Sequence, residues 1–118
     1  MPDTQTDIQN GLLLVRQTQD DSSTRLAVEG ELDLANAHTL ELTLHEALHR
    51  GDEVLVDFGK LEFIDSTGIS LLVMALRGPH AERLSFLPSE SADVRRLFSL
   101  TGLDQRLGFN SGPSAVRA

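Results

Sequence analysis

A serine stands directly after an aspartate at the start of an apolar helical pattern, in the run Asp65-Ser66-Thr67-Gly68. Aspartate is a favoured helix N-cap, because its carboxylate accepts hydrogen bonds from backbone N–H groups of the first turn. Ser66 is therefore expected at the first helical position, with its hydroxyl facing outward. A phosphate on this hydroxyl would meet the positive end of the helix and its unpaired N–H groups. The chemistry that this run suggests is the phosphorylation of Ser66.

The composition limits the classes of function. A chain of 118 residues that is 40% apolar fits a single domain with a packed core. Without cysteine it has no disulfide and no cysteine-based metal or redox site. A net charge of −8 argues against direct binding to nucleic acid or to an anionic membrane, and suits a partner with a basic patch. We find no secretory signal at the N-terminus and no apolar run that could span a bilayer, and we expect a cytoplasmic location.

The hydrophobic pattern of the first half predicts the elements that lead up to Ser66. Two apolar runs, Leu12–Gln19 and Thr24–Glu29, flank a polar turn and indicate an antiparallel hairpin. A helix with one apolar stripe follows, and either Asn36 or Asp33 can cap its start. This helix provides the crossover to Glu53–Phe58, an apolar strand that we expect in parallel pairing inside the sheet.

In the second half, the helix that Asp65 opens is expected to end near Arg77. Arg83–Leu87 reads as a further strand, and a third helix is expected from Ser91 to Gly102, the latter serving as its C-terminal signal. The last apolar residues, 107–109, are expected to add a short strand.

Together these elements predict an α/β fold. The expected order is ββαβαβα(β), which gives one domain with a mixed sheet of four to five strands and helices packed on it. The domain is expected to cover residues 10–110. Residues 1–9 are polar and residues 111–118 are rich in small residues, so we expect both segments to be flexible tails.

Three segments of the sequence resemble the signature of a known family. They are Gly30–Asp33 before the first long helix, Asp65–Ile69 at the second helix and Val94–Leu103 in the third. In this order and spacing they are similar to the STAS domain, and within it to the bacterial anti-sigma factor antagonists. The resemblance runs from about residue 10 to residue 110, and the three segments together make it specific.

The resemblance implies a partner-switching protein that is not itself an enzyme. In that family, an anti-sigma factor that is also a serine kinase phosphorylates the serine after the aspartate. The unphosphorylated antagonist binds this kinase and frees a sigma factor, and a PP2C-type phosphatase restores the serine. By residue-to-residue match, Ser66 is the phosphosite, Asp65 is its neighbour and Asp33 lies near the partner-binding face. Thr67 stands where a second serine is common, a departure that still allows the switch.

The predicted partner-binding surface continues from Ser66 along the second helix. Its residues are Asp33, Asp65, Ser66, Thr67, Gly68, Ile69, Leu71 and Met74. One apolar stripe is enough to pack this helix on the sheet, whereas Leu71 and Met74 lie off that stripe. An exposed apolar patch usually marks an interface. The alternative is a helix that is covered on both sides, in which case these two side chains belong to the core.

Other classes of function fit the sequence less well. A phospho-acceptor receiver domain alternates strand and helix, whereas two strands are expected here before the first helix. It also needs an acidic metal-binding pair beside an acceptor such as Asp57, but Asp20 and Asp21 fall in a hairpin turn. A hydrolase elbow of the form Gly-x-Ser-x-Gly is absent, as is a phosphate loop of the P-loop type. His45 and His49 are spaced by one helical turn without an evident third ligand, so neither a metal nor a cofactor is expected.

The alternative that remains lies within the same fold. A non-switching STAS module could act as a scaffold in a stressosome-like assembly or as a subunit of a lipid transporter. The resemblance favours the switch, because family members that have lost phosphorylation usually lack the serine that this chain keeps at position 66.

Overall fold

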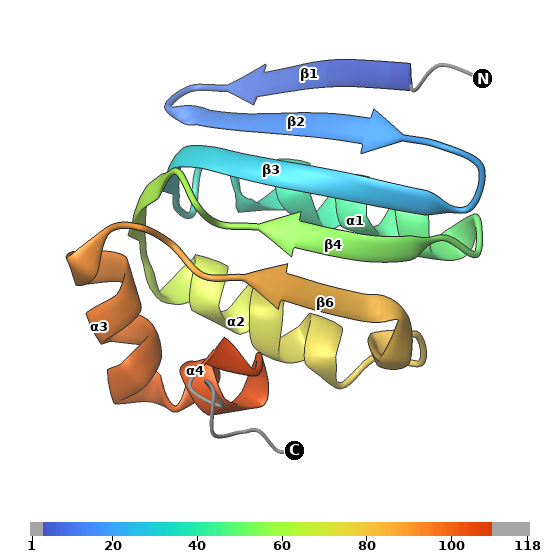
Figure 1. The fold of residues 1–118 in the computed structure, drawn as a ribbon. Coiled ribbons are helices and arrows are strands. Elements are labelled where there is room, and N and C mark those ends of the chain that lie inside the picture. The colour runs from blue at the N-terminus through green and yellow to red at the C-terminus, as the bar shows by residue number, and fades with distance from the viewer. Residues whose placement is uncertain (1–3, 110–118) are drawn as a thin grey trace.

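The computed structural model describes residues 4–109, which form a single sheet with helices packed against it (Figure 1). The elements in chain order are β1 (Thr4–Asn10), β2 (Leu13–Gln19), β3 (Ser23–Leu32), α1 (Ala37–His49), β4 (Glu53–Asp57), β5 (Leu61–Ile64), α2 (Ser66–Leu76), the 3-10 turn η1 (Ala81–Arg83), β6 (Leu84–Leu87), α3 (Ala92–Thr101) and α4 (Leu103–Arg106). The predicted α/β fold with a mixed sheet is confirmed, although the sheet of the described residues has six strands rather than four or five.

The sheet combines an antiparallel and a parallel half. Its order is β1-β2-β3-β4-β6; the pairs β1–β2 and β2–β3 are antiparallel, and the pairs β3–β4 and β4–β6 are parallel. The long strand β3 pairs with β4 along its first half and with β5 along its end. Because β3 and β5 run in parallel and finish side by side, the loop after β3 and the start of α2 meet at one end of the sheet.

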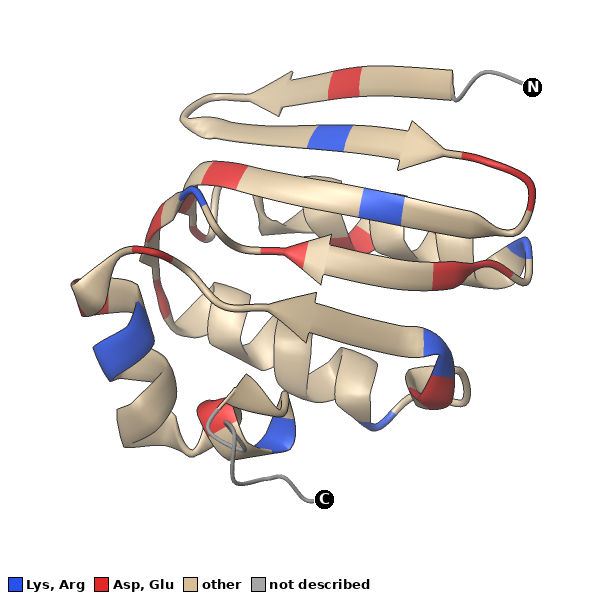
Figure 2. Ribbon diagram, viewed as in Figure 1, with Lys and Arg blue, Asp and Glu red and all other residues tan. Residues whose placement is uncertain are grey.

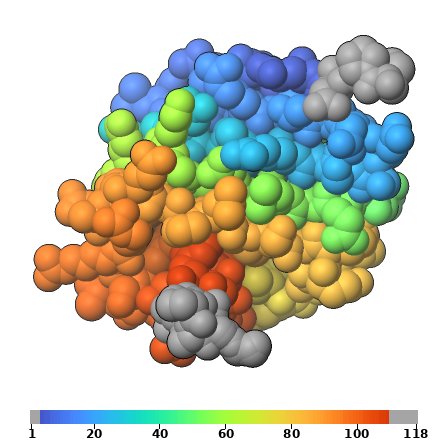
Figure 3. Space-filling model, viewed as in Figure 1, coloured from blue at the N-terminus to red at the C-terminus, as the bar shows by residue number. Residues whose placement is uncertain are grey.

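The core lies on the face of the sheet that α1 and α2 cover, behind the strands in Figure 1. Alternate residues of β3, such as Leu26 and Val28, are fully buried on this face, as their period of two requires. The other face is partly open, and it is the face toward the viewer in Figure 3. Ion pairs cross its strands, with Arg25 bonded to Asp57 and Arg16 bonded to Glu29. The helices, with the loops at their N-termini, therefore form one layer on a single face of the sheet.

The first strand corrects the prediction of a flexible N-terminal tail. Residues 4–9 belong to β1, which pairs with β2 over its whole length, so three strands precede the first helix rather than two. This strand is polar and none of its residues is buried, because it lies at the edge of the sheet. It therefore lacks the alternation of apolar and polar residues that reveals a strand in a sequence. The predicted tail at residues 111–118 lies outside the described residues.

Two further predictions about local structure are wrong. The segment Leu61–Ile64, where the predicted order of elements has no strand between Glu53–Phe58 and the helix at Asp65, is the strand β5. Residues 107–109 form a turn rather than a strand, because the short helix α4 precedes them. Gly102, at φ +78°, ends α3 and starts this helix, whose Leu103 packs into the core together with Leu107 one turn later.

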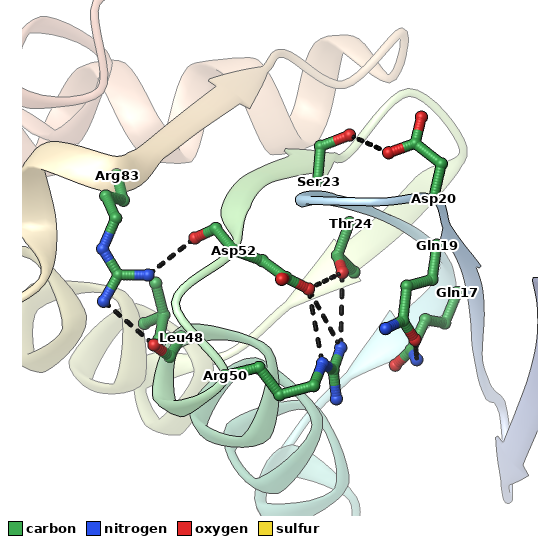
Figure 4. Close-up of polar contacts among 9 residues, drawn as sticks. All are labelled: Gln17, Gln19, Asp20, Ser23, Thr24, Leu48, Arg50, Asp52 and Arg83. Atoms are coloured by element: carbon green, nitrogen blue, oxygen red, sulfur yellow. Dashed lines mark hydrogen bonds and ion pairs between the residues drawn. The ribbon is translucent and has the colours of Figure 1, made fainter.

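A polar cluster fixes the far end of the sheet, where α1 turns into β4. Thr24 and Arg50 both donate to the carboxylate of the buried Asp52, at 2.6 and 3.3 Å (Figure 4). The guanidinium of Arg83 donates to the carbonyl oxygens of Asp52 and Leu48, at 2.7 and 2.9 Å. The Leu48 carbonyl, in the last turn of α1, also accepts from the N–H of Gly51, so Arg83 ties the end of this helix to the start of β4. The cluster is thus structural, and it lies at the opposite end of β4 from Ser66.

Candidate functional site

Asp65 is the N-cap of α2, as predicted. Its backbone is extended, and its Oδ1 accepts from the N–H groups of Thr67 and Gly68 at 2.9 and 3.1 Å. Its own N–H donates to the carbonyl oxygen of Leu32 at the end of β3. The cap therefore fixes the start of α2 against the sheet as well as within the helix.

The second carboxylate oxygen of Asp65 holds the loop that follows β3. Oδ2 accepts from the N–H of Leu34 at 3.1 Å, across 31 positions of the sequence. One side chain thus joins two segments of the predicted surface, the loop around Asp33 and the first turn of α2. The sequence suggested each segment separately, and the structure brings them together.

The loop from Asp33 to Asn36 is closed by its own side chains. Asp33 Oδ1 accepts from the N–H of Ala35 at 3.0 Å, and Asn36 Oδ1 accepts from the N–H of Asp33 at 2.9 Å. The buried Asn36 amide also donates to the carbonyl oxygen of Glu31. Asn36, one of the two predicted residues, is the N-cap of α1, although its side chain makes no cap hydrogen bond. Both side chains shape the loop instead.

Two glycines of the matching segments are required by close approaches. Gly30 has φ +91°, and a Cβ there would lie 2.0 Å from the carbonyl oxygen of Leu12. A Cβ on Gly68 would lie 2.6 Å from Cγ1 of Ile64 and 3.1 Å from Cδ2 of Leu32. The missing side chain of Gly68 therefore lets the first turn of α2 lie directly on the ends of β3 and β5. This contact positions Ser66.

Ser66 is the first residue of α2 and is exposed. Within residues 4–109, no hydrogen bond of its hydroxyl is found, so the oxygen is free to react with an incoming group. The expectation that a phosphate would meet unpaired N–H groups needs correction, because Asp65 already occupies those of Thr67 and Gly68. A phosphate at this position would compete with the Asp65 carboxylate for them.

The surroundings of Ser66 are acidic. Asp65 is its immediate neighbour, Asp33 lies in the adjoining loop and the exposed Glu62 lies in β5. In the described part of the chain, none of these three carboxylates forms an ion pair. Figure 2 shows acidic residues in the majority at the end of the sheet where β3 and β4 finish. Added negative charge at Ser66 would therefore be repelled rather than neutralised.

Leu71 and Met74 lie farther along α2 than the residues of its first turn. They line a groove between α1 and α2 with a volume of about 240 Å³, together with Leu44, Leu48 and Pro79. Met74 is 68% exposed, whereas Leu71 is half-buried. At a rise of about 1.5 Å per residue, Met74 lies about 12 Å along the helix from Ser66. Thr67 and Ile69 are half-buried in the first turn, and Gly68 is buried, so they contribute less surface than Ser66 itself.

Leu34, which is 76% exposed beside Asp65, was not among the residues predicted for this site. The available signal was an apolar residue directly after Asp33, outside the stripe of α1.

The histidines do not form a metal centre in the part of the chain that the structure describes. His45 and His49 stack on the surface of α1 with ring centroids 5.7 Å apart. Residues 4–109 hold no group of three or more side chains suited to binding a metal ion. Over the same residues, none of the helices has the length and apolar character needed to cross a bilayer.

This arrangement is that of a STAS-type domain: a mixed sheet with helices on one face, and a serine at the Asp65-capped start of α2. The family model described as "Mlab, STAS domain" matches residues 15–109. The chain belongs to this STAS domain family. Among curated proteins, the comparison finds no match to the sequence.

Two solved structures with similar folds are both anti-sigma factor antagonists. The antagonist SpoIIAA in its unphosphorylated form has a TM-score of 0.64 and 22% identity, over 77% of this chain and 83% of its own. An antagonist from Mycobacterium paratuberculosis has a TM-score of 0.68 and 20% identity, over 96% of this chain and 92% of its own. At these identities the likeness shows a shared fold.

Proposed function

We propose that this protein is an anti-sigma factor antagonist that switches partners. Its unphosphorylated form binds a cognate anti-sigma factor that is also a serine kinase, and this binding frees a sigma factor. Phosphorylation of Ser66 ends the binding, and a PP2C-type phosphatase reverses the modification. The observation that carries the proposal is the exposed, unbonded Ser66 at the Asp65-capped start of α2 in a STAS domain.

The switch acts through charge at a small site. The unmodified Ser66 offers a neutral hydroxyl that can pack closely against the partner. A phosphate adds about −1.5 to −2 charge next to Asp65, on a chain whose net charge is already −8. Burying this charge without a counter-ion in the interface costs several kcal/mol. A loss of about 4 kcal/mol weakens binding about a thousandfold, which is enough to exchange partners.

The acidic surroundings of Ser66 support this mechanism. Because Asp65 holds the first-turn N–H groups, the phosphate gains little inside the antagonist itself. The modification therefore changes the surface that the partner meets, with little effect on the fold. The ATP for the reaction is bound by the kinase, in keeping with the absence of a phosphate loop from this sequence.

Incubation with candidate anti-sigma kinases and ATP tests the proposal, with intact mass as the readout. We expect a single gain of about 80 Da, the mass of one phosphate group, with a cognate kinase. Ser66→Ala should abolish this gain. Peptide mapping should place the phosphate on Ser66, and a phosphate on Thr67 or Ser70 would refute the assignment.

The alternative of a non-switching STAS module, in a stressosome-like assembly or a lipid transporter, makes a different prediction. Such a module would bind its partner with equal affinity whether Ser66 is serine, alanine or aspartate. Genes for an anti-sigma kinase or a phosphatase beside that of the antagonist would support switching, and transporter genes would support the alternative.

A further inference from the structure

Leu34 is an apolar side chain in an unusual position. It is 76% exposed, the highest value among the large apolar side chains of residues 4–109. Its N–H donates to Oδ2 of Asp65 at 3.1 Å, so its backbone is tied to the residue that caps α2 immediately before Ser66. An exposed leucine therefore stands beside the proposed phosphosite.

Hydrogen bonds on either side of Leu34, made by Asp33 and Asn36, fix the loop that carries it. Asp33 accepts from the N–H of Ala35, and its carbonyl oxygen accepts from the N–H groups of Asn36 and Ala37. Asn36 accepts in turn from the N–H of Asp33, at 2.9 Å. A side chain on such a fixed backbone loses less conformational entropy on binding than one on a mobile loop. The loop therefore needs little further ordering when Leu34 binds a partner.

We propose that Leu34 is the apolar anchor of the partner-binding surface, and that it enters an apolar pocket which the anti-sigma factor offers beside its contact with Ser66. This inference rests on the proposed function. Asp33 follows β3, Glu62 lies in β5, which finishes beside β3, and Asp65 follows β5. The rim of the partner's pocket should therefore be basic.

The other exposed leucines lack this connection to Ser66. Leu42 lies on the outer side of α1, Leu12 in the turn between β1 and β2, Leu87 at the end of β6, and Leu100 near the end of α3. None of them has a backbone bond to Asp65. Leu100 is 74% exposed, which makes it a matched control for Leu34 in both residue type and exposure.

The size of the expected effect follows from the apolar surface that the interface would bury. Leu34→Ala removes three carbon atoms from a side chain that the free protein leaves in water, so the fold should keep its stability. In the complex these atoms would be buried, and their loss should weaken binding about 30-fold, which corresponds to about 2 kcal/mol. Leu34→Met keeps the volume and should stay within about fivefold of the wild type.

The test is titration calorimetry against purified anti-sigma factor kinases from the same genome. The wild type, Leu34→Ala, Leu34→Met and Leu100→Ala are compared on the kinase that binds the wild type, after thermal melts have shown that all four are equally folded. We expect about a 30-fold loss for Leu34→Ala alone, with Leu100→Ala within about twofold of the wild type.

The outcomes separate the two proposals. Equal affinities of Leu34→Ala and the wild type would overturn the anchor and leave the proposed function intact. Equal losses for Leu34→Ala and Leu100→Ala would also overturn it, because the effect would then not depend on the place beside Ser66. If no such kinase bound the wild type, the proposed function would fail and the anchor with it.

Discussion

Replacing Asp65 with alanine should destabilise the protein by about 2 kcal/mol. The carboxylate accepts three backbone hydrogen bonds, from Thr67, Gly68 and Leu34. Loss of the two bonds in the first turn is the loss of an N-cap, which costs about 0.5–2 kcal/mol. Loss of the bond to the more exposed Leu34 N–H adds about 0.5–1 kcal/mol, because water can replace part of it.

Urea and thermal unfolding, followed by circular dichroism, measure this change. For a domain of this size, a loss of about 2 kcal/mol should lower the melting temperature by about 8 °C. The slope of the free energy of unfolding against urea concentration should stay unchanged. Asp65→Asn should lose less, about 1 kcal/mol, because its amide oxygen can still cap the helix while the amide nitrogen faces the Leu34 N–H.

Asp33→Ala is the matched control, since this carboxylate accepts from only one backbone N–H among the described residues, that of Ala35. It should cost about 1 kcal/mol or less. If Asp65→Ala and Asp33→Ala were equally stable, or if Asp65→Ala lost less than about 0.5 kcal/mol, the role of Asp65 as the link between the two segments would be wrong.

Two further predictions concern the residues that position the site and the far end of the sheet. Gly30→Ala should lower the free energy of unfolding by about 3 kcal/mol or more, because its Cβ would lie 2.0 Å from the Leu12 carbonyl oxygen at φ +91°. Gly11→Ala, at φ +61° in open space, should lower it by only about 1 kcal/mol. Urea unfolding of both variants checks this, and equal losses would contradict it. Thr24→Val keeps the shape of the side chain but removes a hydrogen-bond donor to the buried Asp52 carboxylate, so the free energy of unfolding should fall by about 1–3 kcal/mol. An unchanged urea midpoint would show that Arg50 alone satisfies this carboxylate.

Local rules were sufficient for the start of α2. An aspartate before an apolar helical pattern predicts an N-cap, and the structure confirms both the cap and the place of Ser66 at the first helical position. The apolar runs of β2, β3 and β4 were also recognisable, because each strand buries alternate residues. The edge strand β6 was recognisable from its short apolar run, in which alternate residues are half-buried.

Other features depend on contacts that no local pattern contains. The polar strand β1 exists because β2 offers it a complete ladder, and β5 exists because β3 extends beyond β4. The bond between Asp65 and Leu34 spans 31 positions, and it forms only once β3 and β5 lie side by side. The exposed Leu34 could not be recognised for the same reason, since burial is a property of the folded chain.

The most direct test of the proposed switch is the affinity of the cognate anti-sigma kinase for three forms of the protein, measured by titration calorimetry. Ser66→Ala should bind as tightly as the unmodified wild type, since it keeps a small neutral side chain at the start of α2. The phosphorylated protein should bind about a thousandfold more weakly, and Ser66→Asp should reproduce part of this loss through its single charge. Equal affinities for Ser66→Ala and Ser66→Asp, together with undiminished binding of the phosphorylated protein, would contradict the account.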